Sequence, residues 1–229
     1  MKNKLFFLWL SVGCGLVPAI PCFSQWTGSP FRQKVFVENK GQFAEEIMFS
    51  AASGVVNVGF SKSGLIYEYN EAVMKKETGR DGKKEKKLET KYHSLRMEWV
   101  GSSPAVEMAA EEKVSFYYSY SFDPAKDKEG VKAGAYRKII YRNLYPHIDV
   151  EYILPEKGGV KYSFLVHPGA DISRIKMQWS GEEISKDAGG NVVIKSTFGD
   201  FIDHAPETFF AGNDQHIPSS FILNNNIVS

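Results

Sequence analysis

The chain has 229 residues, of which 43% are hydrophobic and 14% aromatic, so it is long enough to bury a core as one domain. Its 28 basic and 27 acidic residues almost cancel, which excludes a strong bulk attraction to nucleic acid or to anionic lipid. We therefore expect no nucleic-acid partner.

Residues 1–25 have the layout of a secretory signal peptide. Two lysines fall within the first four residues, residues 5–12 are apolar except for one serine, and small or turn-forming residues follow. The apolar run is short for a membrane span. We expect cleavage after Ser24 or Gln25 and export, with no membrane span in the mature chain. A lipoprotein lipidated at Cys14 is the weaker alternative, because the chain stays apolar after that cysteine.

Cleavage at this point removes both cysteines, Cys14 and Cys22. The mature chain then has no disulfide, and it has no thiolate for nucleophilic or metal chemistry. A domain of roughly 200 residues can be stable through its core alone. We expect residues 26–229 to form one β domain.

The rest of the chain has the period-two pattern of β-strands. Apolar residues occupy alternate positions, so one face of each strand can meet a core and the other water. Glycine, proline, asparagine and aspartate separate these runs, and no window has a helical stripe. We expect an all-β, mostly antiparallel, β-sandwich-like domain, with one lobe or two. Strands are predicted over residues 34–38, 47–51, 55–60, 65–69, 95–100, 114–120, 136–141, 148–154, 160–166, 175–179, 192–195, 208–211 and 220–223.

Residues 75–91 interrupt this pattern with eight basic and four acidic side chains and almost no apolar ones. One interpretation is a basic arm that contacts phosphate or lipopolysaccharide. The other is the solvated tip of a long hairpin, which is flexible because it has nothing to bury. Interleaved acids and the lack of aromatic residues favour the second, so we predict a charged flexible loop.

Residues 114–122 contain a row of alternating aromatic side chains. Phe116, Tyr118, Tyr120 and Phe122 would share one strand face, with Tyr117 on the other. An exposed row could stack on sugar rings, but a row buried against another sheet is more common. We favour the core.

His147, Asp149 and Glu151 would share one face of a strand and are residue types that bind zinc or manganese. Asp149 and Glu151 could also form a glycosidase pair, although neighbours on one strand face lie side by side and not across a substrate. The alternative is a solvent face paired with Lys161 across a hairpin. No other strand supplies ligands, so we predict no metal, no cofactor and no catalytic residue.

The hairpin of residues 148–154 and 160–166 gives a definite prediction of faces. Tyr152, Phe164 and Trp179 should lie on the buried side, with Glu151 and Lys161 exposed on the other. A slip of one residue would reverse every face.

The stretch from 158 to 181 contains His167, Asp171 and a Ser-x-x-Lys spacing at Ser173 and Lys176. That spacing supports acyl-enzyme chemistry when a helix brings the lysine beside the hydroxyl. Here the lysine lies in a period-two segment and a Pro-Gly corner precedes it. We predict two strands and a turn.

Five segments together resemble one protein family. They are FVENKGQF at 36–43, YSFDPAK at 120–126, YRNLYPHIDVEY at 141–152, VKYSFLVHPGADISRIKMQWSG at 160–181, and a Gly-Asp followed by PETF near 199–209. The chain is similar, over residues 35–229, to the N-terminal β domain of large bacterial secreted proteins. In those proteins the domain typically precedes SBBP β-propeller-like repeats or immunoglobulin-like modules, often with a gliding-motility-associated, type IX secretion domain at the C-terminus.

The resemblance implies a non-enzymatic module that is extracellular or on the cell surface, with downstream β-repeat modules as partners. His147 stands where that family usually has glycine, which weakens the metal hypothesis. The chain ends in FILNNNIVS, where such proteins continue, so we expect a truncated product for which the periplasm is an alternative location. The function we expect is a structural or adhesive module that binds a surface glycan or protein. The alternative is a carbohydrate-binding or glycan-hydrolysing β-sandwich.

Overall fold

The computed structural model describes residues 34–78, 84–121, 130–180, 183–211 and 215–229. Every strand pairing in this part of the chain is antiparallel, and the only helix is one turn of 3-10 helix, η1 (Ile172–Arg174). The predicted all-β fold is confirmed. The strands are β1 (Phe36–Glu38), β2 (Ile47–Ser53), β3 (Val56–Ser61), β4 (Gly64–Thr78), β5 (Lys84–Trp99), β6 (Glu107–Tyr120), β7 (Val131–Tyr145), β8 (Ile148–Ile153), β9 (Lys161–Val166), β10 (Met177–Trp179), β11 (Glu183–Lys186), β12 (Val192–Lys195), β13 (Phe201–Asp203), β14 (Thr208–Phe209), β15 (His216–Ile217), β16 (Leu223–Asn224) and β17 (Ile227–Val228).

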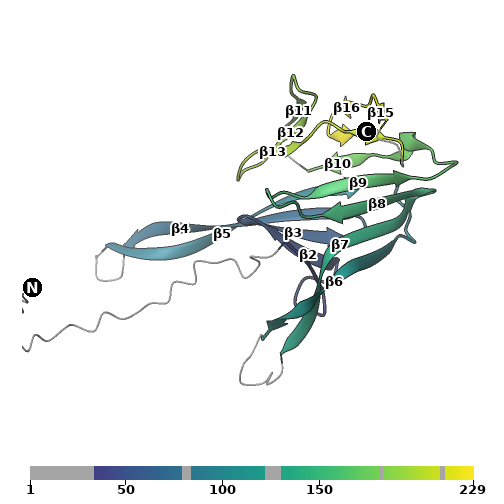
Figure 1. Ribbon diagram of the computed structural model, residues 1–229. Coiled ribbons are helices and arrows are strands. Elements are labelled where there is room, and N and C mark those ends of the chain that lie inside the picture. The colour runs from purple at the N-terminus through teal and green to yellow at the C-terminus, as the bar shows by residue number, and fades with distance from the viewer. Residues whose placement is uncertain (1–33, 79–83, 122–129, 181–182, 212–214) are drawn as a thin grey trace, which may run out of the picture.

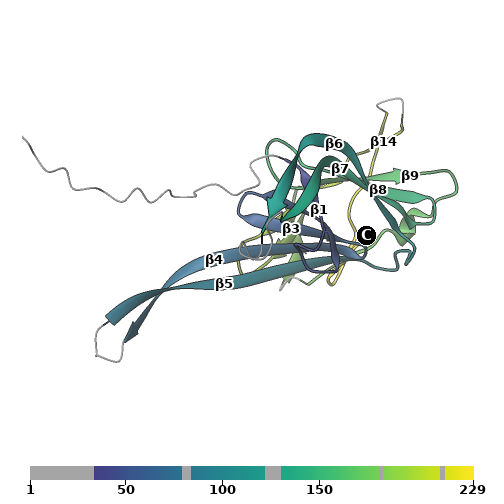
Figure 2. The same cartoon turned by 90° about the horizontal axis from the view of Figure 1, so that it is seen from below.

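Twelve of these strands form one large sheet in the order β16-β17-β10-β5-β4-β3-β2-β1-β7-β8-β9, with β6 on β7. The sheet curls on itself, so that β7, β8 and β9 lie over β2 to β5 and β1 joins the two layers (Figures 1 and 2). Because most of the buried apolar residues form one cluster between the layers, the curled sheet is sandwich-like.

Aromatic side chains join the two layers. The Phe60 ring of β3 meets Tyr152 of β8 at 5.3 Å between centroids, and Trp99 of β5 meets Phe164 of β9 at 5.5 Å. Both contacts are edge-to-face, the favourable geometry for paired rings. The core is therefore continuous between strands far apart in the sequence.

The small sheet β11-β12-β13 packs against the same core. Phe201 of β13 contacts Tyr67 at 5.0 Å, and Phe198 stacks on Tyr69 at 5.6 Å, each between ring centroids. Val192 and Ile194 of β12 are fully buried in the main cluster. Two of the three strands, β11 and β13, were not predicted, because each presents only one or two apolar residues.

The hairpin prediction for residues 148–166 is largely confirmed. Tyr152 and Trp179 are buried, Phe164 is half-buried in the core, and Lys161 is exposed. Glu151 is only partly exposed, since it contacts Lys138.

Two details of this hairpin and of the turn after it depart from the simple alternating pattern. Val166 is in phase with Tyr162 and Phe164 but is half exposed, because it is the last residue of an edge strand. Residues 172–174 form η1, where only a turn was predicted, since the Asp171 side chain accepts the Ser173 N–H as a cap.

Strands β4 and β5 extend well beyond the body as a projecting hairpin (Figures 1 and 2), here called the arm: residues 70–78 and 84–92. The predicted strands stopped at 69 and began again at 95, so the loop expected over 75–91 is wrong in extent. The pairing runs without a break from Gly64 with Glu98 to Thr78 with Lys84. A ladder of backbone hydrogen bonds continues without buried side chains once its register is set. Residues 79–83 of the predicted loop lie outside the described residues.

A second hairpin, β6 with β7, also leaves the body (Figure 1). Phe116, Tyr118 and Tyr120 are half-buried there against a small cluster of Val35, Val37, Ala133 and Ala135. The predicted burial of the row is thus partly confirmed, and Phe122 lies outside the described residues. Tyr117 is on the opposite face, 57% exposed, with the Lys132 ammonium 5.6 Å from its ring centroid.

Candidate functional site

The three residues proposed as metal ligands do not converge. Asp149 and Glu151 share one face of β8, but His147 lies in the turn before the strand with φ at +63° and is exposed. Asp149 instead accepts a hydrogen bond from the Asn143 N–H at 2.7 Å and pairs with His167 Nε2 at 3.0 Å. The histidine beside Asp149 is therefore one that comes from the end of β9.

This environment changes the acidity of Asp149. Partial desolvation, the largest single influence, raises the pKa of Asp149. The hydrogen bonds from the Asn143 N–H and from His167 together outweigh it, so the net pKa lies below its ordinary value. Asp149 is consequently a charged group that holds the irregular turn between β7 and β8, where the register shifts.

Glu151 has a different partner. Its carboxylate accepts from the Lys138 Nζ at 3.0 Å, and the Glu112 carboxylate is 3.7 Å from the same nitrogen. The expected partner, Lys161, is opposite Ile153 in the register. The hydrogen bond to Glu151 raises the pKa of Lys138, which keeps the lysine protonated and unable to act as a base.

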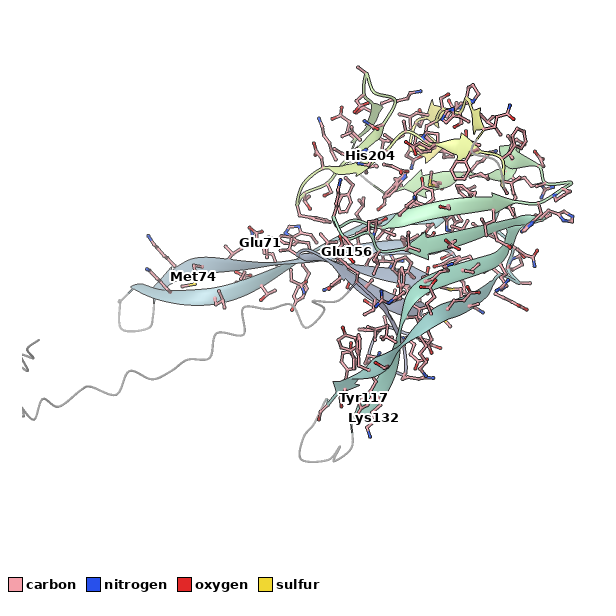
Figure 3. All side chains as sticks on the ribbon, in the orientation of Figure 1. Glu71, Met74, Tyr117, Lys132, Glu156 and His204 are labelled. Carbon is pink, nitrogen blue, oxygen red and sulfur yellow. The ribbon has the colours of Figure 1, made fainter. Side chains whose placement is uncertain are left out.

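Glu112, Lys138 and Glu151 line a groove of about 800 Å³ over β6, β7 and β8. Its charged residues are Lys34, Arg137, Lys138, Glu112, Glu151 and Glu156, the last labelled in Figure 3. Three positive and three negative side chains leave the groove without net charge. Its walls offer ion pairs and hydrogen bonds to a polar molecule and include no serine, cysteine or histidine nucleophile.

Among the described residues, no three histidine, cysteine, aspartate or glutamate side chains gather as a possible metal site. The expectation of a metal-free domain stays a prediction. A glycosidase arrangement is also not assembled by the pair from β8, because Asp149 and Glu151 each contact a different side chain, His167 and Lys138.

Ser173 and Lys176, the residues of the Ser-x-x-Lys spacing, both make structural hydrogen bonds. The Ser173 hydroxyl donates to Asp171 Oδ1 at 2.6 Å, and the backbone N–H of Ser173 donates to the same oxygen at 3.1 Å. Lys176 follows the 3-10 turn, and its backbone carbonyl accepts from the Tyr145 hydroxyl at 3.2 Å. Ser173 is thus part of a helix cap.

A family model described as a domain of unknown function (DUF7948) matches residues 36–229. The chain belongs to this family. No curated protein and no solved structure matches it. The matched region of the DUF7948 domain begins at the first residue of β1 and extends past β17, so it includes every strand described above.

One ionisable residue of the DUF7948 domain was missed by the sequence analysis. Asp203, at the end of β13, accepts a hydrogen bond from the Tyr162 hydroxyl of β9 at 2.8 Å. Burial raises the pKa of Asp203 to about 6, while the Tyr162 hydrogen bond and the nearby His204 (labelled in Figure 3) oppose that rise. No pattern marked Asp203, since its burial depends on how the small sheet docks on the main one.

Within the described residues, no helix of the DUF7948 domain is both long and apolar enough to cross a membrane.

Proposed function

We propose that this chain is a non-enzymatic structural or adhesive module of an exported or cell-surface protein. The observation that supports the proposal is the arm, which projects from the body (Figure 1) with Met74, Leu88 and Tyr92 exposed along it. Large apolar side chains on a projecting element indicate a surface that contacts another macromolecule.

The groove supports the non-enzymatic part of this proposal. Its two best-placed carboxylates, Glu112 and Glu151, lie against one protonated lysine. General acid–base catalysis needs a group whose pKa lies near the working pH, and Lys138 is shifted upward, away from it.

Export and a place beside other modules rest on the resemblance to secreted bacterial proteins with SBBP repeats or gliding-motility-associated domains. In such an arrangement the body anchors the domain to its neighbours and the arm extends outward. The apolar start of the chain is consistent with passage through a membrane.

A carbohydrate-binding or glycan-hydrolysing β-sandwich is the second candidate, and the polar groove favours it. The aromatic row supports it less well, because Phe116, Tyr118 and Tyr120 are half-buried against β1 and β7. A glycan array separates the two functions.

Removing the arm tests the proposal. Because Asn70 is paired with Tyr92, replacing residues 71–91 by Asn-Gly should close the hairpin with a two-residue turn. Beads coated with the intact protein should be retained in flow on immobilised envelope of the source bacterium. Beads coated with the armless variant should pass, while both proteins melt cooperatively at similar temperatures. Equal retention of the two, or a glycan bound equally by both, contradicts the proposal.

A further inference from the structure

The register of the arm separates its side chains into two distinct faces. Because the pairing of β4 with β5 is unbroken, even-numbered residues of both strands share one face and odd-numbered residues share the other. In the body the odd-numbered face is buried, as at Leu65, Leu95 and Met97. We call this the inner face and the even-numbered one the outer face.

Most large apolar side chains of the arm lie on the outer face, and Val73 is the exception among the described side chains. Beyond Tyr69, the outer face carries Met74, Leu88 and Tyr92, which are 58%, 64% and 78% exposed. Met74 and Leu88 are direct cross-strand partners, and Tyr92 lies two same-face positions closer to the body, with Thr90 between. A hairpin adapted only to water would be polar on both faces, so this distribution indicates that the outer face is covered by a partner.

The described acidic side chains of the arm lie on the inner face, whereas lysines occur on both faces. On the inner face, Glu89 is 3.5 Å from the Lys75 ammonium and Glu71 is 3.5 Å from the His93 ring nitrogen. Among the described side chains of the arm, the outer face holds two lysines, Lys76 and Lys86, and no acid. The next outer-face acid lies at the base of the arm, the exposed Glu68.

We propose that the outer face of the arm docks on the outer face of a second copy of this chain, with the two arms antiparallel. This inference rests on the binding role proposed for the arm. A two-fold axis between two stacked faces places each strand over its own copy running in the opposite direction. Ala72 then lies over the partner's Ala72, and Lys76 lies over the partner's Glu68.

Strand β5 fits the same axis. Thr90, which is paired with Ala72 across the hairpin, lies over the partner's Thr90. Leu88 then lies over the partner's Tyr92 and Lys86 over the partner's Ser94. Small side chains at the axis allow the two sheets to approach closely. On β5 Leu88 and Tyr92 flank the axis, and on β4 Met74 lies over the partner's Asn70 and the opposite charges of Lys76 and Glu68 meet at the ends.

The alternative occupant of a lysine-bearing apolar face is an anionic lipid surface. The distribution of charge favours a second copy, because Glu68 is four residues from Ala72 toward the body and Lys76 is four residues from it toward the tip. A lipid surface gains nothing from Glu68 and is repelled by it. The face has about ten residues, fewer than the roughly 20–30 a side of a stable complex, so the dimer should be weak and concentration-dependent.

Sedimentation velocity of the purified protein over a series of concentrations tests this proposal. We expect a monomer–dimer equilibrium in which Lys76→Glu and Glu68→Lys each raise the dissociation constant on the order of tenfold. The double variant Glu68→Lys/Lys76→Glu should restore it, because the exchange re-creates both opposite-charge contacts. Lys75→Glu is the matched control, since it makes the same change one residue away on the inner face and should leave the dissociation constant unchanged.

A protein that stays monomeric at every concentration would overturn the proposal, as would single variants without effect or a double variant that is not restored. Co-sedimentation of a monomer with phosphatidylcholine–phosphatidylglycerol vesicles would assign the face to lipid instead. Melting curves confirm that each variant is folded. Beads that need the arm for retention although the protein is monomeric would overturn only the second-copy inference, and the proposed function would stand.

Discussion

Two aspartates of this domain have pKa values shifted in opposite directions by their surroundings. Asp149 accepts from an N–H and from His167, and these donors lower its pKa in spite of partial desolvation. Asp203 lies between the small sheet and the main sheet, where burial raises its pKa. An ionised aspartate therefore stabilises the turn at Asp149, whereas ionisation of Asp203 opposes folding.

Asp203 predicts a pH dependence of stability. Its folded pKa, about 6, is above the ordinary 3.8, so between these values the folded protein binds the proton more strongly than the unfolded chain does. The contribution is complete below the unfolded pKa and is lost as pH rises through the folded one. Asp203→Asn keeps an acceptor for Tyr162 without the charge. It should match the wild type near pH 4 and exceed it in free energy of unfolding by about 2–3 kcal/mol above about pH 7.

Chemical denaturation at a series of pH values measures this difference. Asp200→Asn is the control, because it removes the same charge from an exposed position close in the chain. A difference between wild type and Asp203→Asn that is constant from about pH 4 to about pH 7 would contradict the assignment.

At the scale of elements, the arm is a two-stranded ladder with neither face covered by the body. Isolated two-stranded hairpins are marginally stable in water, so the arm depends on the registered strands that continue from the body. Its side chains are exposed or half exposed along its described length, while those of β7 and β8 are largely buried. Local opening should therefore cost least in the arm.

Limited proteolysis tests this difference. Trypsin should cut first within residues 75–91, which contain eight lysine or arginine residues and no anchoring core side chain. Mass spectrometry of the first fragments locates the cut. The control is the region 136–180, which also contains lysines and arginines but lies in the curled sheet. Early cleavage there with the arm intact would show that the body opens before the arm.

At the scale of the whole molecule, one curled sheet encloses the core and the small sheet docks on it. Tyr67 contacts Phe201 of the small sheet, and Tyr162 donates to Asp203 beside it. Docking therefore combines ring packing with hydrogen bonds, one of which, from Tyr162 to Asp203, is partly buried. Stability comes from burial between strands, without a disulfide in the part of the chain that the structure describes.

Because the stability of the domain comes from packing, we predict that a chelator does not change its melting temperature. A structural metal contributes directly to folding free energy, so its removal lowers the melting temperature. We expect the same melting temperature with and without a strong chelator, because Asp149 and Glu151 already have partners in His167 and Lys138. A fall of several degrees that zinc or manganese reverses, and that His147→Ala abolishes, would restore the metal hypothesis.

The sequence by itself determined the local features of this protein. Alternation along residues 148–154 and 160–166 predicted the hairpin and the burial of Tyr152, because side chains of a strand point to opposite faces whatever surrounds it. Composition and period likewise predicted the all-β class. These properties depend on neighbours within a few residues, so local sequence patterns are sufficient to predict them.

Only the tertiary structure decided which distant side chains meet. Asp149 with His167, Glu151 with Lys138 and Tyr162 with Asp203 are contacts between strands, set by register and by the curl of the sheet. The separation of charges on the arm has the same origin, since the interleaved acids of residues 75–91 predicted a solvated tip. Register places the described acids of the arm on the inner face, whereas Lys76, Lys86 and most of the large apolar side chains lie on the outer one. Which strands pair depends on the whole chain, so the hydrophobic periodicity of a single strand does not predict it.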